Sequence, residues 1–590
     1  MHVSKTETVN YIYLRFLDSG ENLSENSQKS DIVIALSLSL FVLASCSVLG
    51  PANVVSDSKS SCEQMTGSIP NGLIGLPTGE VTIVSTQYLA ASPLVMGPPQ
   101  APTPYARIQP ALPDHCQVKG TIASLDPKAP AINFQVNLPS VWNGRSLQYG
   151  GGGFNGVLIN ALGLPPAAPL DKPAPLARGF VTYGTDSGHQ NTPGVPLQAF
   201  SMNDEALANF AYASYKKVRD VSVELMKRRY GRGPDRMYFM GSSEGGREAL
   251  MLAQRFPNDF DGIFARVPVI NWVALQHAGT RAGIAQFGSG WITPAKIKLV
   301  GDAVASACDA ADGIVDGIIS DHEGCRSRFD VSKLRCADGS DSGASCLSDA
   351  QTKAVQALYS GYRFDFDLAN GVRNYPGWPM GGEATPGVGP TGGWANWWVG
   401  SSAPVQPPVP ANSIQWFYGS GAIRYFITRD PNFDVRQYDP KRYADRIRTM
   451  SALMDATDPD LSVFAAAGGK LIIKEHMADY AQSPYAGIEY YKSVVAKMGQ
   501  SEVDRFARLY IAPGVDHVGT GAPALTDMLE VLTDWVEKAK EPAALTVATQ
   551  AFEPPFAVTM SRPLCRYPNW PKYRGVGDSN QAASFDCVKQ

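Results

Sequence analysis

Residues 237–256 read MYFMGSSEGGREALMLAQRF, and this stretch gives the clearest indication of the fold. An apolar run typical of a buried strand ends in glycine and serine, and a helical pattern follows. Gly-x-Ser-x-Gly between a strand and a helix is typical of a nucleophile elbow, which raises the central serine above a sheet. The pattern therefore predicts an α/β-hydrolase core with Ser243 as nucleophile. The alternative is a small residue that merely caps the helix.

The segments around this elbow continue the alternation of strands and helices. Strands are expected within residues 80–89, 132–139, 145–153, 179–189, 236–243, 262–268, 468–476 and 506–514, and helices over 203–230, 244–256, 486–499 and 524–540. Such alternation is typical of a mostly parallel sheet. Between residues 267 and 457 the pattern gives way to loop-rich segments with cysteines and tryptophans. We therefore expect a catalytic domain over residues 76–266 and 458–590, with a domain inserted over 267–457.

The N-terminal segment predicts export. Residues 32–44 form an apolar run that is too short to span a bilayer and suits a secretory signal. The run ends in LASC, which looks like a lipobox in which Cys46 is lipidated; the alternative is an ordinary signal peptide with an incidental cysteine. We expect residues 1–46 to be a signal segment and residues 47–75 a serine-rich tether. The protein would then lie in the periplasm, on the outer membrane through a lipid anchor, or outside the cell.

The nine cysteines agree with export, because exported chains often carry disulfides. Lipidation of Cys46 leaves an even set, which many pairings could satisfy. Pairing neighbours in the sequence gives Cys62–Cys116, Cys308–Cys325, Cys336–Cys346 and Cys565–Cys587. No Cys-x-x-Cys pair occurs, so a zinc site is not expected. The formal net charge of −4 gives no reason to expect nucleic acid as a partner, because phosphate binding needs clustered lysine and arginine.

A serine nucleophile needs a base and an acid that orients the base, in the chain order Ser, acid, His in this fold. Of the seven histidines, only His476 and His517 follow both the elbow and the insertion. His517 comes just after a late strand, where the base is expected, and Asp479 follows the preceding strand, where the acid is expected. His476 is interpreted as structural. Asp516 is interpreted as a loop residue, because its side chain and that of its neighbour His517 point apart.

Two backbone N–H groups are expected to form an oxyanion hole. One belongs to Glu244, which follows the serine. The other is expected from the glycine run over residues 150–153, directly after a strand, and Gly153 is preferred. The alternative for the four glycines is a flexible turn.

Three stretches, over residues 241–263, 307–325 and 561–578, resemble the tannase and feruloyl esterase family. The similarity extends from about residue 62 to the C-terminus. It is closest to the branch that contains mono(2-hydroxyethyl) terephthalate hydrolase. The resemblance implies an α/β-hydrolase core, a lid with a calcium site, and hydrolysis of esters of aromatic acids.

The resemblance also identifies two departures from the family pattern. The family joins a cysteine before the nucleophile to a cysteine after the catalytic histidine, and here these positions are Ser242 and Val518. Trp397 matches a substrate-contacting position, whereas residues 402–419 lack the lid arginine that holds a free carboxylate in the terephthalate branch. Arg424 lies just beyond this stretch. We therefore expect that a terephthalate monoester is not the natural substrate.

The segment CDAADGIVDGI, residues 308–318, concentrates three carboxylates between glycines. Calcium prefers such oxygen ligands, although Asp-Gly pairs are also common in turns. The resemblance implies one structural calcium ion, and its ligands would be Asp309, Asp312 and Asp316 with the carbonyls of Ile314 and Ile318.

These observations predict a monomeric, exported serine carboxylesterase that hydrolyses esters of aromatic or phenolic acids through an acyl-enzyme. One alternative is a non-catalytic surface lipoprotein that binds aromatic compounds on a hydrolase scaffold. Another is a serine peptidase with a similar core. The complete set of Ser243, Asp479 and His517 argues against the first alternative, and the resemblance to a calcium-binding lid argues against the second.

Overall fold

The computed structural model describes residues 53–55, 57–98, 107–385 and 393–589. Cys46 and the predicted signal segment lie outside these residues. Among the described residues, no helix combines the length and the apolar character needed to cross a membrane. The four disulfides predicted from neighbouring cysteines are all present, with Cα–Cα distances of 4.9–5.7 Å.

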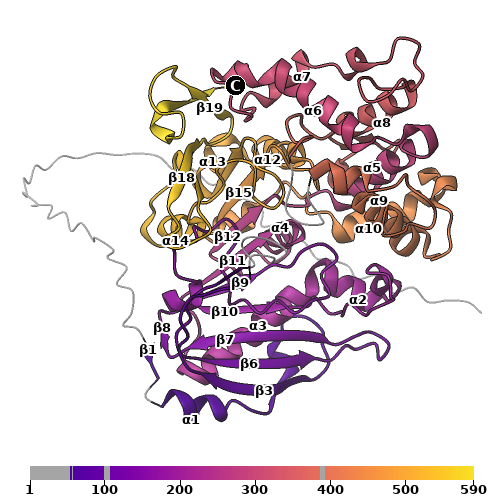
Figure 1. Cartoon of the computed structure of the whole chain (residues 1–590). Helices are drawn as coiled ribbons and strands as arrows, with labels where there is room; N and C mark the ends of the chain where they lie inside the picture. Colours follow the sequence, from indigo (N-terminus) through magenta and orange to yellow (C-terminus); the bar gives the residue numbers. More distant parts are fainter. Residues whose placement is uncertain (1–52, 56, 99–106, 386–392, 590) are drawn as a thin grey trace, which may run out of the picture. The chain divides into compact units, whose positions relative to one another are not determined.

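A ten-stranded mixed sheet runs through the predicted catalytic domain (Figure 1). Its order is β16 (Ala507–Ala512), β15 (Lys470–His476), β12 (Gly262–Arg266), β11 (Arg236–Ser242), β9 (Arg145–Tyr149), β10 (Val181–Thr185), β7 (Ile132–Pro139), β6 (His115–Ile122), β3 (Val81–Leu89) and β2 (Ser68–Ile69). The strands from β16 to β10 are parallel, and those from β7 onward are antiparallel. The carboxyl ends of β11, β15 and β16 therefore meet at one edge, which is where the site lies.

Helices cover both faces of the sheet because its central strands are apolar on both sides. The covering helices are α3 (Ser214–Tyr230), α4 (Glu244–Arg255), α12 (Pro484–Met498) and α14 (Met528–Lys538). On β11, Phe239 packs in the buried cluster that holds apolar residues of α3, α4 and α12. Its neighbours Tyr238 and Met240 point to the other face and pack in the cluster that contains Trp535 of α14. The predicted α/β architecture of the core is therefore present.

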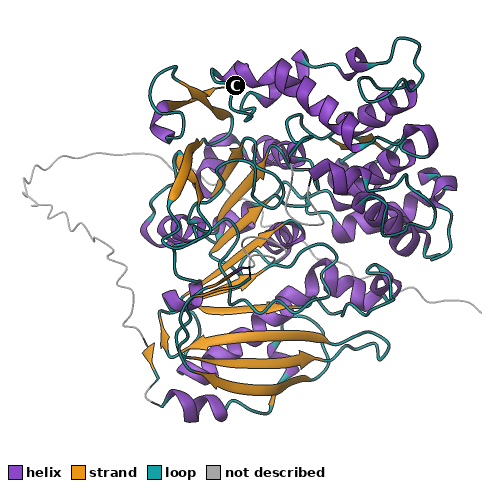
Figure 2. Cartoon of the chain, in the orientation of Figure 1, coloured by secondary structure: helices purple, strands orange, loops and turns teal. Residues whose placement is uncertain are grey.

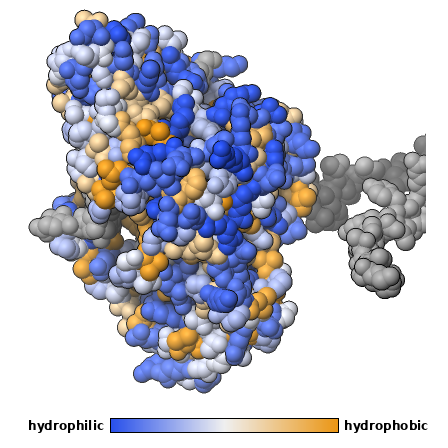
Figure 3. All heavy atoms as spheres, turned by 90° about the vertical axis from the view of Figure 1, so that its right-hand side faces the viewer, coloured by the Kyte–Doolittle hydropathy of each residue, from blue (hydrophilic) through white to orange (hydrophobic). Residues whose placement is uncertain are grey.

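The segment inserted between β12 and β15 is richer in helix than expected (Figure 2). It contains α5 (Trp272–Ala285), α6 (Pro294–Cys308), α7 (His322–Arg328), α8 (Asp349–Tyr359), α9 (Ile414–Gly421), α10 (Ala444–Met454) and α11 (Ser462–Ala466). Helices α5 to α10 share a buried cluster that includes Trp378, Trp394, Trp398 and Trp416, so most of the tryptophans form core, as predicted. Phe464 of α11 packs in the main core instead. On the face shown in Figure 3, hydrophilic residues dominate and hydrophobic ones are scattered, as on an ordinary solvated surface.

The expected tether over residues 47–75 differs from the structure in its second half. Residues 58–63 form helix α1 (Ser58–Glu63), and Cys62, Met65 and Ile69 are buried in the main core. The disulfide to Cys116 fixes this helix beside β6. Serine enrichment is typical of tethers, but the apolar residues among the serines bury themselves here, so the folded part begins before residue 76.

Asp455, which follows α10, is a buried carboxyl whose state depends on pH. One oxygen accepts a hydrogen bond from the N–H of Val273 at 2.8 Å and the other from the hydroxyl of Ser451. Burial raises the pKa of Asp455 from 3.8 to about 7. The folded state therefore binds the proton more tightly than the unfolded state. This group's contribution to stability is complete below about pH 4 and is lost as the pH rises through 7.

Asp455→Asn is therefore expected to raise the melting temperature at pH 8 and to change it little at pH 5. Each tenfold change in proton affinity corresponds to about 1.4 kcal/mol, so the effect at pH 8 is on the order of a few kcal/mol. Thermal unfolding at several pH values measures it. Asp445→Asn is the control, because Asp445 is exposed on the surface of α10. A gain at pH 8 no larger than that of the control would contradict the assignment.

Candidate active site

The predicted nucleophile lies on a sharp turn between β11 and α4. Ser243 has φ 62° and ψ −119°, a strained conformation for a residue other than glycine. The positions on either side of the turn, Gly241 and Gly245, have no room for a side chain. A Cβ on Gly241 would lie 2.1 Å from the carbonyl oxygen of Gly245, and a Cβ on Gly245 would lie 2.8 Å from that of Gly151. The turn can therefore form only because these two positions lack side chains.

The side chains of Ser243, His517 and Asp479 lie within hydrogen-bond distance of one another. His517 Nε2 lies 2.9 Å from the Oγ of Ser243, and its Nδ1 lies 2.7 Å from Asp479 Oδ2. His517 follows β16 and Asp479 follows β15, so the parallel sheet brings both loops to the elbow. The other oxygen of Asp479 accepts the N–H groups of Ala481 and Gln482 at 2.7 and 3.0 Å. These hydrogen bonds fix the orientation of the Asp479 carboxylate. The residue is buried, with 2% of its surface exposed.

The glycine run after β9 lies against the start of α4. The N–H of Gly151 donates to Glu248 at 2.9 Å, and that of Gly152 donates to Asn155 at 2.7 Å. The N–H of Gly153 makes no hydrogen bond to any described residue. Glu244 is the first residue of α4, a position whose N–H has no acceptor within a helix. The N–H groups of Gly153 and Glu244, which were predicted for the oxyanion hole, thus have no acceptor among the described residues and are available to a ligand.

Buried charged groups hold the elbow in place beneath the site. Glu244 forms an ion pair with Arg247, which also donates to the carbonyls of Ala211 and Met454. Burial outweighs the attraction of this guanidinium and raises the pKa of Glu244 to about 7. Glu248 accepts from the side chain of Asn155 at 2.7 Å as well as from the glycine run. Helix α4 therefore fixes both the elbow and the glycine run.

A cavity of about 450 Å³ opens onto Ser243 and His517. Its lining is mostly aromatic and apolar, and it combines residues of the sheet domain with residues of the inserted segment. Besides the elbow and the glycine run, the lining residues are Phe154, Arg266, Val269, Trp272, Leu275, Gln276, Trp397, Gln415, Tyr418, Tyr480, Ala481 and Val518. The ring of Trp397 lies 6.3 Å from that of His517, and its indole N–H donates to Gln415 at 3.0 Å. Trp397 is therefore placed beside the predicted base, whereas Arg424 does not line the cavity.

Three polar residues of this cavity were not predicted from the sequence. Gln276 and Gln415 are more than nine-tenths buried, and each has one buried amide atom without a partner among the described residues. Arg266 donates from Nε to the hydroxyl of Ser242 at 2.9 Å and from Nη2 to the carbonyl of His517 at 3.1 Å. A charged residue at the end of the apolar run GIFAR was a signal that could have drawn attention to Arg266.

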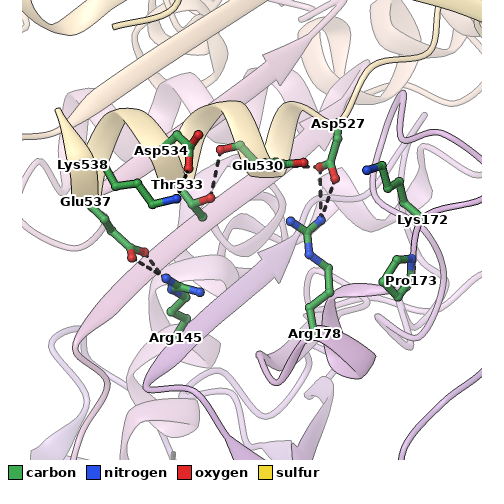
Figure 4. A pocket seen from close by; sticks show the side chains of 10 residues that line it. All are labelled: Arg145, Lys172, Pro173, Arg178, Asp527, Glu530, Thr533, Asp534, Glu537 and Lys538. Atoms are coloured by element: carbon green, nitrogen blue, oxygen red, sulfur yellow. Dashed lines mark hydrogen bonds and ion pairs between the residues drawn. The ribbon is translucent and has the colours of Figure 1, made fainter. Parts of the chain in front are cut away.

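A second cavity, of about 330 Å³, lies along α14 and carries a different chemistry (Figure 4). Several of its charged groups form ion pairs with one another. Arg145 pairs with Glu537, and Arg178 pairs with Asp527 at 3.0 Å. The described residues that line it include no serine, cysteine or histidine, so they offer no nucleophile or base of the kind found in the first cavity.

The predicted calcium loop is closed by the Cys308–Cys325 disulfide. Asp309 and Asp312 are buried, and each accepts a hydrogen bond from loop backbone N–H groups, of Gly317 and Ser320 respectively. Asp316 instead forms an ion pair with Arg562 at 2.7 Å. No group of three metal-binding side chains occurs in the described parts of the chain. The two buried carboxylates fit a cation, whereas Asp316 would have to leave its arginine to join them.

Comparison with known proteins assigns the chain to a family. The profile described as tannase and feruloyl esterase matches residues 116–588. An uncharacterized esterase of Agrobacterium fabrum is 35% identical over 95% of this chain and 98% of its own length. Mono(2-hydroxyethyl) terephthalate hydrolase of Piscinibacter sakaiensis is 32% identical over 81% of this chain and 85% of its own.

Solved structures agree with this assignment. Feruloyl esterase B from Aspergillus oryzae superimposes with a TM-score of 0.70 at 25% identity, covering 90% of this chain and all of that one. The family match spans most of the chain, and the similar proteins are esterases. The chain belongs to the tannase and feruloyl esterase family and is a carboxylic ester hydrolase.

Proposed function

We propose that the protein is a serine esterase that acts through an acyl-enzyme. Its substrates are proposed to be esters of aromatic acids whose acyl group carries no second charged group. The observation that carries this proposal is that His517 contacts Ser243 with one ring nitrogen and Asp479 with the other, at the wall of an aromatic cavity. This arrangement suits a nucleophile, a general base and an orienting acid.

The proposed reaction begins when Ser243 Oγ attacks the ester carbonyl carbon and His517 Nε2 takes its proton. Negative charge then develops on the carbonyl oxygen, where the N–H groups of Gly153 and Glu244 stabilise it. The tetrahedral intermediate collapses, the alcohol leaves with the proton from His517, and an acyl-serine remains. Water activated by the same histidine attacks the acyl carbon and releases the acid and free Ser243.

The cavity lining supports an aromatic acyl group without a second charge. Trp397, Tyr418 and Phe154 offer ring faces that suit a planar apolar group. Among the described residues that line the cavity, Arg266 is the only lysine or arginine, and its guanidinium is bound to Ser242 and to the carbonyl of His517. A carboxylate on the far side of the ring would lose its hydration without gaining an ion pair. The part of the insertion that supplies Trp397 and Tyr418 would act as a lid.

A panel of esters tests this proposal. We expect hydrolysis of methyl ferulate, methyl gallate and ethyl benzoate. For mono(2-hydroxyethyl) terephthalate we expect a kcat/KM about 10- to 100-fold lower than for its neutral methyl ester, because burial of an unpaired charge is costly. No hydrolysis of any aromatic ester would contradict the proposed function. Equal values for the charged and neutral terephthalates would contradict the proposed charge preference.

One structural calcium ion is proposed, held by Asp309, Asp312 and Asp316 with the carbonyls of Ile314 and Ile318. Its support is the pair of buried carboxylates in an oxygen-rich loop closed by a disulfide. Removal of calcium by a chelator is expected to lower the melting temperature, whereas protein that remains folded is expected to keep most of its turnover rate. The reason is that the loop is remote from Ser243 in the sequence and does not line its cavity. Elemental analysis of the native protein that finds no calcium would contradict this site.

Export is also proposed, with lipidation at Cys46 as the anchor. Four disulfides support an oxidising compartment. The enzyme is proposed to act as a monomer.

A further inference from the structure

Arg266 connects the two loops on which the proposed reaction depends. It is the last residue of β12, next to β11 on one side and β15 on the other. Its backbone carbonyl accepts the N–H of Ser243 at 3.0 Å. Its side chain donates to the hydroxyl of Ser242 at 2.9 Å and to the carbonyl of His517 at 3.1 Å. One residue thus contacts the elbow at two points and the histidine loop at a third.

The histidine loop has little else that ties it directly to the elbow. No disulfide joins the loops, since the four bridges in the described chain lie elsewhere. The carboxylate of Asp516 closes the loop on itself, by accepting the N–H groups of Gly519 and Thr520. Its backbone carbonyl lies 2.7 Å from Nδ1 of His476 on β15, which is not part of the elbow. Among the contacts of the described residues, the hydrogen bond between His517 and Ser243 also links the loop to the elbow, and it must break and re-form during the proposed reaction.

The chemistry of an arginine side chain suits this role. Its planar guanidinium presents several N–H donors in a fixed fork and stays charged at all working pH values, so it can span two acceptors at once. A lysine ammonium is a single point charge and could not hold the same two acceptors in the same geometry. A charge-assisted hydrogen bond to a backbone carbonyl restrains the main chain of His517, whatever the state of its ring.

We propose that Arg266 is a positioning residue that holds the loop of His517 at the right distance from Ser243 throughout the reaction. This inference rests on the proposed function, because it assigns Arg266 a task in the same reaction. It differs from a substrate-binding role, in which the guanidinium would bind an anionic group of the ester. It also differs from a purely structural role, in which the loss of Arg266 would affect stability alone.

Kinetics and hydrogen exchange of Arg266→Met test the proposal. This change keeps the apolar stem and removes both side-chain bonds. Using a neutral p-nitrophenyl ester, we expect kcat to fall by about 10- to 100-fold with KM changed less than about threefold, because a small displacement of a catalytic group costs this much in rate. Deuterium uptake of the amides over residues 513–521 is expected to rise. Arg266→Lys is expected to restore only part of kcat.

Arg145→Met is the matched control, because Arg145 is also a partly buried arginine on a strand of the same sheet. It pairs with Glu537 (Figure 4), and neither residue lines the first cavity. It is expected to lower the melting temperature while leaving kcat and the exchange of residues 513–521 unchanged. If Arg266→Met does not fold, Arg266→Lys carries the test with the same two readouts.

Three results would overturn the inference. They are an unchanged kcat in the Arg266 variant, a loss of kcat/KM that comes from a higher KM alone, and hydrogen exchange of residues 513–521 no faster than in the Arg145 control. None of them would overturn the proposed function, which depends on Ser243. Conversely, a fully active Ser243→Ala variant would overturn the proposed function whatever Arg266 does.

Discussion

Ser243→Ala is expected to abolish ester hydrolysis, whereas Ser242→Ala is expected to retain most of it. Only Ser243 stands at the strained turn with its Oγ 2.9 Å from His517 Nε2. Loss of a nucleophilic serine from such a site typically lowers kcat by on the order of 10⁶-fold. The hydroxyl of Ser242 faces Arg266 instead, so its removal takes away one hydrogen bond without touching the reacting atoms.

The comparison of the two serine variants is made with a neutral p-nitrophenyl ester, and circular dichroism checks that both variants are folded. The two serines are neighbours, so each variant serves as the control for the other. Similar activities in the two variants would show that the elbow is not the site of attack.

Asp479→Asn is expected to lower kcat by on the order of 10⁴-fold while the protein stays folded. The Oδ1 of Asp479 accepts two backbone N–H groups, so an asparagine would place its carbonyl oxygen there and turn its NH₂ group toward His517. The imidazole would then have to accept at Nδ1 and carry its proton on Nε2. In that tautomer it cannot take the proton of Ser243.

Asp516→Asn is the matched control for this change, because Asp516 is a buried aspartate directly beside His517. Its carboxylate accepts from Gly519 and Thr520 within its own loop and does not contact the ring. We expect a lower melting temperature and a kcat within about tenfold of the wild type, since only loop hydrogen bonds are weakened. A larger loss of kcat from Asp516→Asn than from Asp479→Asn would exchange the roles of the two aspartates.

The elbow could be predicted from the sequence because its determinants are local. The run of glycines around Ser243 reflects contacts within a few residues and with one neighbouring loop, and these leave a readable pattern. His517 and Asp479 could be placed because parallel strands bring the loops that follow them to one edge. Their distance to Ser243 is set by packing between strands far apart in the sequence, which the pattern of residues does not encode.

Other features depend on such long-range contacts and were missed or misjudged. Arg266 acquires its partners from two other segments of the chain, so nothing in its own neighbourhood identifies them. The apolar residues between the serines of the expected tether find their core only through β6 and the Cys62–Cys116 bridge. The insertion shows weak helical periodicity because many of its helices are short and buried on several sides.

Covalent trapping of the nucleophile shows whether Ser243 is the residue that attacks the ester. An active-site-directed fluorophosphonate is incubated with the protein, which is then digested with trypsin and sequenced by mass spectrometry. Both serines lie in the peptide over residues 237–247, so fragmentation must assign the modified position. We expect a phosphonyl group on Ser243, absent from Ser243→Ala and strongly reduced in His517→Ala. Modification of Ser242 or of a serine elsewhere, or no modification of enzyme that hydrolyses esters, would contradict it.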